Sequence, residues 1–127
     1  MKIRIRFNGK EAEAELNKTI TARKIYDALP IKSNANTWGG EIYFDMNLLG
    51  KASPKIEEEN AKEEVEIGDL GYWLQGSCFC IFFGRTPVST NDKPRAASKV
   101  NVFGKVTKGL EVLKKINSGE SVRIEMH

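Results

Sequence analysis

The sequence predicts a mainly β protein, arranged as a closed barrel of about eight short strands with a short helix over each end. Two observations lead to this prediction. Short runs in which apolar and polar residues alternate recur along the chain, with turn signals rich in Gly, Asn and Pro between them. Only two segments change to helical spacing. A closed sheet fills its interior with side chains and leaves no edge strand exposed; an open two-layer sandwich is the alternative.

The first segments predict a β-hairpin. Residues Lys2–Phe7 alternate strictly, with apolar side chains on one face and basic side chains on the other. Asn8-Gly9 follows, which is the strongest short signal for a hairpin turn. Residues Glu11–Leu16 then alternate again, which completes the second strand.

A change of period predicts a short helix over Thr19–Leu29. Its apolar residues fall at helical spacing, and Thr21 is of a residue type that caps helices. Tyr26 lies on the apolar side and is predicted to be a core residue. Pro30 ends the helix, because proline cannot continue it.

The rest of the chain predicts further strands joined by turns. The predicted strands are Lys32–Thr37, Glu41–Phe44, Glu64–Ile67, Leu70–Leu74, Ser77–Phe83, Lys99–Val106 and Val122–Met126. Gly39-Gly40 marks a turn, Leu48–Ala61 an irregular excursion, and Asn91–Ala97 a polar loop. Residues Lys108–Ile116 predict a second helix, ended by Gly119. Ser77–Phe83 is the most apolar strand, as expected for burial on both faces.

Composition indicates a single domain over residues 1–127. A net charge of +3 with dispersed basic residues does not suit a nucleic-acid binder. The start of the chain has no apolar region typical of a signal peptide. The longest apolar run, Cys78–Phe83, is far shorter than the ~20 residues of a membrane helix. We therefore expect a cytoplasmic protein with neither a nucleic-acid nor a membrane partner.

The two cysteines, Cys78 and Cys80, lie in one strand-like run. At this spacing their side chains share a face about 7 Å apart along the strand, too far for a disulfide. The one histidine is His127, and no second Cys pair completes a tetrahedral metal site. The sequence predicts buried reduced thiols, no metal and no cofactor.

Two segments resemble cyclophilins. Val102–Val106 reads V-F-G-K-V and is followed by Gly109–Val112, G-L-E-V, similar to their V-F-G-K-V and G-M-x-x-V signature. Gly76–Ile81, G-S-C-F-C-I, is similar to their G-S-Q-F-F-I strand. The order of strands and helices is also similar, so the resemblance covers most of the chain and implies a cyclophilin-like barrel.

A closer resemblance is to a small prokaryotic group of cyclophilin-like proteins. Asn36–Phe44, N-T-W-G-G-E-I-Y-F, resembles the first signature of that group. Gly68–Trp73 and Phe82–Pro87, G-D-L-G-Y-W and F-F-G-R-T-P, resemble the second. This resemblance implies a minimal barrel of the cyclophilin type and names no reaction.

The catalytic pattern of cyclophilins does not carry over. Prolyl isomerisation faces a barrier of ~18–20 kcal/mol, and cyclophilins lower it with an apolar pocket and an arginine in an F-H-R-I-I-P strand. The matching segment, Ile31–Trp38, has no arginine, and its only cation, Lys32, lacks the planar fork. The family's Gln and second Phe in G-S-Q-F-F-I correspond to Cys78 and Cys80, and the His before V-F-G-K-V corresponds to Val100.

Three charged residues are the remaining catalytic candidates. Arg85 follows a strand and could reach a groove, or it could be a solvated arginine at the end of a strand. Glu41 and Asp69 flank the signature turns and could form a carboxylate pair. The alternative is that they hydrogen-bond the backbone of their turns, as such side chains commonly do.

The candidate ligand-binding residues are mostly aromatic. They are Tyr43, Phe44, Tyr72, Trp73, Phe83 and Thr86. The first two would keep the apolar floor of the cyclophilin pocket. Tyr72 and Trp73 alternate across a strand, so one should face inward and the other outward. An outward Trp would form a recognition surface; packing of both in the core is the alternative.

Three hypotheses of function follow. The first is a binding domain that holds a proline-containing peptide or a small molecule in an aromatic groove. The second is an enzyme, either a weak prolyl isomerase or a catalyst of another reaction that uses Glu41, Arg85 or Asp69. The third is a subunit of a larger amide-cleaving assembly, because related barrels resemble subunits of such enzymes.

Overall fold

The computed structural model describes residues 1–46 and 54–127, and it is mainly β, as predicted. Its strands are β1 Lys2–Phe7, β2 Lys10–Leu16, β3 Ile31–Asn34, β4 Asn36–Trp38, β5 Glu41–Asp45, β6 Lys62–Glu64, β7 Asp69–Trp73, β8 Cys78–Phe82, β9 Arg95–Lys108 and β10 Ser121–Met126. Its helices are α1 Ile20–Asp27 and α2 Leu110–Leu113. The first half of the predicted excursion Leu48–Ala61 falls largely outside the described residues.

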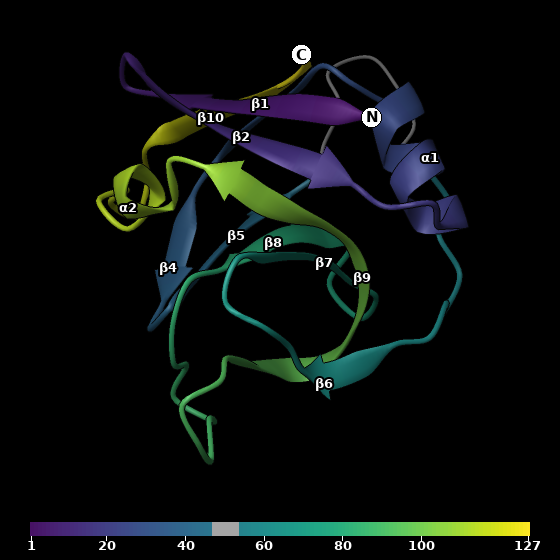
Figure 1. Cartoon of the computed structure of the whole chain (residues 1–127), viewed down its shortest axis with the longest axis vertical. Coiled ribbons are helices and arrows are strands. Elements are labelled where there is room, and N and C mark those ends of the chain that lie inside the picture. Colours follow the sequence, from purple (N-terminus) through teal and green to yellow (C-terminus); the bar gives the residue numbers. More distant parts are fainter. Residues whose placement is uncertain (47–53) are drawn as a thin grey trace.

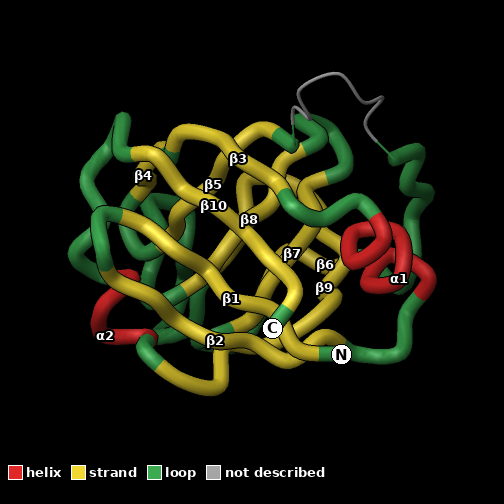
Figure 2. The backbone as a smooth tube through the Cα atoms, turned by 90° about the horizontal axis from the view of Figure 1, so that it is seen from above, coloured by secondary structure: helices red, strands yellow, loops and turns green. Residues whose placement is uncertain are grey.

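All the strands belong to one curled sheet. Its hydrogen-bonded path runs β3-β10-β1-β2-β9-β7-β8-β5-β4, and β6 pairs with β9 beside this path. The long strand β9 bends through the sheet, pairing with β2 at one end and with β6 at the other (Figure 1). The two helices lie on opposite sides of the sheet (Figures 1 and 2).

The predicted closed barrel is not confirmed, because the sheet formed by residues 1–46 and 54–127 is open and has ten strands. The path ends at β3 and β4, and no ladder joins these two strands in the described part of the chain. Both come from one predicted strand, Lys32–Thr37, which breaks at Ala35. The N–H of Ala35 donates to the Glu120 carbonyl oxygen, and its own carbonyl accepts from Gly119 N–H, both at 2.8 Å. The chain therefore turns a corner here instead of closing the ladder.

The first hairpin forms as predicted. Ile3, Ile5 and Phe7 are buried on one face of β1. Asn8 and Gly9 take positive φ angles of 46° and 73°, the left-handed backbone that an Asn-Gly turn supplies. The cap of α1 differs from the prediction: Thr19, not Thr21, is the N-cap, and its Oγ1 accepts from Ala22 N–H at 3.0 Å.

Two predicted boundaries are wrong because strand pairing extends β9 at both ends. Arg95, expected in a polar loop, already pairs with Glu64 of β6. Lys108, expected to begin a helix, still pairs with Glu13 of β2. Gly109 follows with a φ of 84°, so α2 starts only after it and is four residues long.

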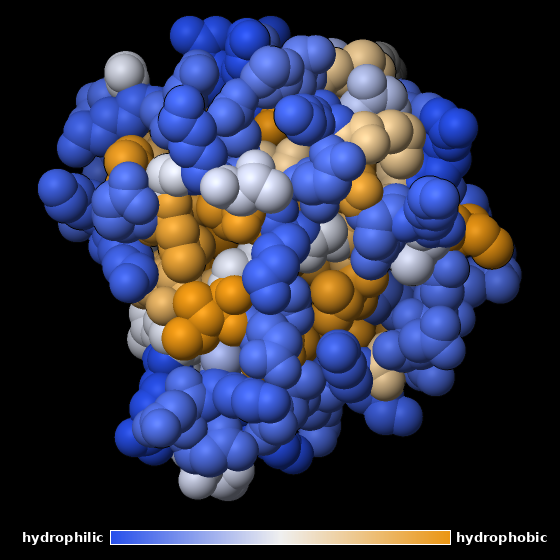
Figure 3. All heavy atoms as spheres, viewed as in Figure 1, coloured by the Kyte–Doolittle hydropathy of each residue, from blue (hydrophilic) through white to orange (hydrophobic). Residues whose placement is uncertain are grey.

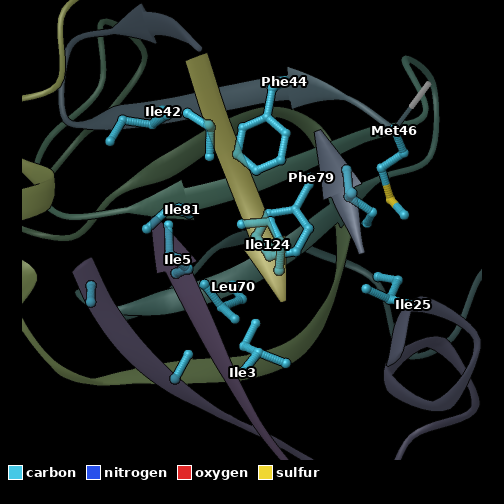
Figure 4. Close-up of a cluster of buried hydrophobic side chains, with 14 of the residues drawn as sticks. Ile3, Ile5, Ile25, Ile42, Phe44, Met46, Leu70, Phe79, Ile81 and Ile124 are labelled. Carbon is cyan, nitrogen blue, oxygen red and sulfur yellow. The ribbon is translucent and has the colours of Figure 1, made fainter. Parts of the chain in front are cut away.

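The sheet packs side chains on both faces. The main core contains Phe44, Phe79 and Phe103: the first two rings stack at 4.9 Å, and the last two meet edge to face at 5.0 Å. Figure 4 shows Phe79 and Ile81 of β8 among side chains from β1, β7 and β10. A second cluster consists of Val65, Cys78, Cys80, Phe82, Ala96 and Val100, with Tyr43, Trp73 and Val102 packed against it. Strand β8 is buried along its whole length, as predicted.

Candidate functional site

A cavity of about 290 Å³ opens beside the second cluster. It is lined by Trp38, Glu41, Tyr43, Trp73, Ala96, Ala97 and Val100. These residues come from four strands, β4, β5, β7 and β9, and we call the space the Glu41 cavity. Hydrophobic residues also gather across the middle of the face seen in Figure 3, but apolar surface is common on any protein. The Glu41 cavity is the more specific feature, because it joins a concave, largely apolar space to a buried carboxyl group.

Strand geometry brings the lining together. Glu41 and Tyr43 are two apart on β5, so both side chains leave the same face of the sheet. Trp38 lies opposite Glu41 in the β4–β5 pair. Trp73 lies opposite Val100 in the β7–β9 pair. Four short sequence segments therefore form one wall of aromatic and aliphatic groups around a single carboxyl.

The two signature motifs meet at the turn that precedes Glu41. Gly40 N–H donates to the Arg85 carbonyl oxygen at 2.6 Å, and Phe83 N–H donates to the Gly40 carbonyl oxygen at 2.7 Å. A Cβ atom on Gly40 would lie 2.2 Å from the carbonyl carbon of Gly84. Gly39 has a φ of 57°, which favours glycine. The Gly-Gly pair and the F-F-G-R-T-P segment thus fix the start of β5, and with it the position of Glu41.

The Glu41 carboxyl is buried, with 6% of the residue exposed. Burial raises its pKa to about 7, while a hydrogen bond with the Cys80 thiol acts in the opposite direction. No lysine, arginine or histidine forms an ion pair with it among the described residues. The group is therefore divided between its acid and carboxylate forms near neutral pH.

The two cysteines are free and buried, as predicted. Burial raises the pKa of the Cys78 thiol to about 11, and it also raises that of the Cys80 thiol. Both groups therefore remain protonated at neutral pH. A protonated thiol is a poor nucleophile, so these residues act as small apolar groups.

Trp73 is held from two sides. Its Nε1–H donates to Ser98 Oγ, and Ser98 Oγ donates to Gln75 Oε1 at 3.0 Å. Gly76 lies against the ring, since a Cβ there would be 2.3 Å from it. These contacts fix the orientation of the indole at the cavity.

The structure separates the predicted aromatic residues by face. Tyr43 and Trp73 line the Glu41 cavity, whereas Phe44 and Tyr72 are buried in the main core. Phe83 packs against the main core as well. Tyr72 and Trp73 point to opposite faces because they are adjacent on β7.

The other polar candidates lie outside the cavity lining. Thr86 Oγ1 donates to the Arg95 carbonyl oxygen and ties its loop to β9. Arg85 Nη2 points to the Ser89 carbonyl oxygen at 3.5 Å. Asp69 Oδ2 accepts from Glu66 N–H at 2.8 Å, the turn hydrogen bond that was the alternative explanation for this residue. The structure therefore does not join Asp69 and Glu41 in one site.

Sequence reasoning missed four lining residues, namely Trp38, Ala96, Ala97 and Val100. Trp38 could have been found from the Gly-Gly turn, because a two-residue turn places it opposite Glu41. The β9 residues carry no such signal, since they reach the cavity only through pairing of β9 with β6 and β7.

The described residues contain no group of three or more His, Cys, Asp or Glu side chains arranged to hold a metal ion. None of the described helices has the length and apolar character needed to cross a membrane.

Comparisons with known proteins agree with the fold. The solution structure of the hypothetical protein AF2241 from Archaeoglobus fulgidus is 46% identical, with a TM-score of 0.80, and covers 100% of this chain and 95% of that chain. A structure of McbB in complex with tryptophan has a TM-score of 0.63 at 14% identity, over 98% of this chain and 44% of that chain. This second likeness concerns the fold alone. No curated protein matched the chain.

A family comparison extends over nearly the whole sequence. The model of the family described as cyclophilin-like matches residues 1–125. The signature motifs named in the sequence analysis lie within this range, and two of them, Asn36–Phe44 and Gly68–Trp73, contribute residues to the cavity lining. The chain belongs to the cyclophilin-like family.

Proposed function

We propose that this protein is a binding domain that takes a small molecule, or one side chain of a proline-containing peptide, into the Glu41 cavity. The observation that carries the proposal is the lining: Trp38, Tyr43 and Trp73 surround one buried carboxyl. Binding sites for small ligands are mostly apolar and aromatic, with a few polar groups that orient the ligand. A volume of about 290 Å³ is at the lower end for such sites, which favours a compact ligand.

Prolyl isomerisation of the cyclophilin type has little support. The described cavity lining contains no arginine or lysine, and Arg85 is directed to its own loop. An arginine that hydrogen-bonds the substrate is what the resemblance to cyclophilins implied. We expect no acceleration of cis–trans exchange in an Ala-Pro peptide at micromolar protein, measured by NMR exchange. A measurable acceleration would support the isomerase hypothesis instead.

A thermal-shift panel tests the binding proposal. The probes are benzyl alcohol, N-acetylproline amide, choline and tryptophan, the last because McbB was solved in complex with it. A ligand that binds only the folded state raises the melting temperature. We expect a shift with at least one probe, and its loss in Ala97→Phe, which places a ring at the cavity. Ala97→Ser is the matched control. An equal shift in Ala97→Phe would place the binding elsewhere, and no shift with any probe would contradict the proposal.

A second candidate function is catalysis by Glu41. A buried carboxyl with a pKa of about 7 is suited to give and take protons at neutral pH. This would be a different reaction from isomerisation, carried out on a ligand in the same cavity. Conversion of any bound probe, followed by NMR of the probe and abolished in Glu41→Gln, would favour it. Unchanged conversion in that variant would exclude Glu41 as the acid–base group.

A further inference from the structure

We propose that the Glu41 cavity binds a small organic ammonium ion, with Trp38, Tyr43 and Trp73 as an aromatic cage and the Glu41 carboxylate as its counter-ion. This inference rests on the proposed binding function and specifies the ligand class. The inference rests on the opposite charges of an ammonium ion and the Glu41 carboxylate, and on the residue types and volume of the cavity.

When Glu41 is ionised, the site carries one negative charge that no described residue balances. Glu41 is 6% exposed and lacks an ion pair among the described residues. An isolated buried carboxylate is costly, and a cation within contact distance removes much of that cost. A cationic ligand therefore gains an interaction that the folded protein does not itself supply.

The groups around Glu41 do not provide that cation. The titratable groups that interact with Glu41 are the thiols of Cys78 and Cys80 on β8. Asp45 of β5 acts on the Cys78 thiol as Glu41 does. The β4, β7 and β9 residues of the lining are uncharged. Arg95, which begins β9, is paired with Glu63 at 2.8 Å. Glu41 is thus the only charged side chain in the described cavity lining, and its ionised form would attract a positive charge.

The rings add the second part of the recognition. The face of a Trp or Tyr ring attracts an ammonium ion by about 0.5–2 kcal/mol, more as water is excluded. The ring–ring contacts found in the described residues all lie in the main core, among Phe44, Phe79 and Phe103. The rings of the Glu41 cavity are therefore not stacked on one another. Gly76 lies against part of the Trp73 ring, and the sides of the three rings that line the cavity are those a ligand would meet.

The size of the cavity favours a small molecule over a peptide. A space of about 290 Å³ accommodates a compact ligand such as a small ammonium compound and is small for several residues of a peptide. We therefore assign the site to a free small ammonium compound. A peptide that carries trimethyllysine has the same head group and serves as the competing source in the test.

The test compares choline with 3,3-dimethylbutan-1-ol, its neutral isostere. Both tryptophans of the chain line the cavity, so intrinsic fluorescence reports on the site directly. At pH 8 we expect choline to bind about tenfold more tightly than the alcohol, or better. Because choline keeps its charge, its affinity should rise from pH 6 to pH 8 as Glu41 ionises.

Variants connect the preference to the carboxylate. Glu41→Gln should lower choline affinity about tenfold, abolish its pH dependence and remove the preference for choline over the alcohol. Glu111→Gln, an exposed change with the same loss of charge, is the matched control and should bind choline like the wild type. Circular dichroism of each variant confirms that it is folded.

The outcomes separate this inference from the proposed function. Equal affinity for choline and 3,3-dimethylbutan-1-ol would overturn the ammonium assignment and leave the proposed binding function intact. The same would follow if benzyl alcohol bound and choline did not. Tighter binding of a trimethyllysine peptide than of choline would overturn the small-molecule assignment. Absence of binding by the whole probe panel would overturn the binding function itself.

Discussion

The two faces of strand β8 show the difference between side chains that stabilise the fold and side chains that form a site. Phe79 and Ile81 point into the main core, where aromatic rings stack and fill the space. Cys78, Cys80 and Phe82 point to the opposite face, into the second cluster. Both faces are buried, and the second borders the Glu41 cavity and its carboxyl group. Burial alone therefore does not distinguish a core from a site. The second face differs because the space beside it is not filled by the described side chains and contains one carboxyl group that has no ion pair among them.

The largest expected effect is on the main-core face. Phe79→Ala should lower the free energy of unfolding by about 3–5 kcal/mol, because it leaves a cavity between Phe44 and Phe103. Tyr43→Ala, on the cavity face, should cost much less, since that residue is only partly buried. Urea unfolding measures both. Equal losses would remove the distinction between the faces.

The Gly-Gly turn should be nearly as sensitive. Gly40→Ala is expected to cost about 3 kcal/mol, because its Cβ would lie 2.2 Å from the Gly84 backbone. Gly84→Ala is the matched control: its Cβ would meet its nearest atom at 3.8 Å, an ordinary contact. Urea unfolding of the two variants should therefore differ clearly. A tolerated Gly40→Ala would show that this close approach does not fix the start of β5.

The buried carboxyl predicts a pH dependence of stability. Burial raises the Glu41 pKa from 4.5 to about 7, so the folded state binds a proton that the unfolded state releases. The contribution of this bound proton to the free energy of unfolding is complete below pH 4.5. It is lost as pH rises through 7. At about 1.4 kcal/mol per pH unit, the wild type should lose about 3 kcal/mol relative to Glu41→Gln between pH 4 and pH 8.

Urea unfolding of both proteins across this pH range measures the difference, and groups common to both cancel. Glu111→Gln should follow the wild type, because its carboxyl is exposed. Parallel profiles for the wild type and Glu41→Gln would mean that the carboxyl has an ordinary pKa, and the site would lose its distinguishing charge behaviour.

The smallest expected effect concerns the support of Trp73. Ser98→Ala removes the acceptor of the indole N–H and should cost about 1 kcal/mol. The indole ¹H–¹⁵N resonance of Trp73 should move upfield, because its proton loses the hydrogen bond to Ser98 Oγ and becomes more shielded. Ser89→Ala, on the loop beside Thr86, is a control that should leave this resonance in place. An unmoved Trp73 resonance in Ser98→Ala would show that the bond does not hold the ring.

Local pattern was enough to predict the parts of the fold that depend on local sequence. The alternation of Lys2–Phe7 with its Asn-Gly turn specified the first hairpin, and the apolar run of β8 specified a strand buried on both faces. Pairing between distant segments was not visible. Arg95 and Lys108 became part of β9 because β6 and β2 offer hydrogen-bond partners to them. The opening of the sheet at Ala35 has the same origin.

The site was predictable to a similar extent. Glu41, Tyr43 and Trp73 were candidates from residue type and alternation, and the structure places them around one cavity. Their predicted companion Asp69 is held by its own turn. Val100 and the two alanines of β9 give no chemical signal, because small aliphatic residues form a wall only where tertiary pairing brings them.

The most direct test of the central claim, that ligands enter the Glu41 cavity, is a ¹H–¹⁵N NMR titration of the two indole resonances. The chain has two tryptophans, Trp38 and Trp73, and both line the cavity from different strands. Titration with choline should shift both indole signals together, with one saturation curve, and Ala97→Phe should abolish both shifts. Saturable shifts of backbone amides elsewhere, with both indole signals unmoved, would contradict the account.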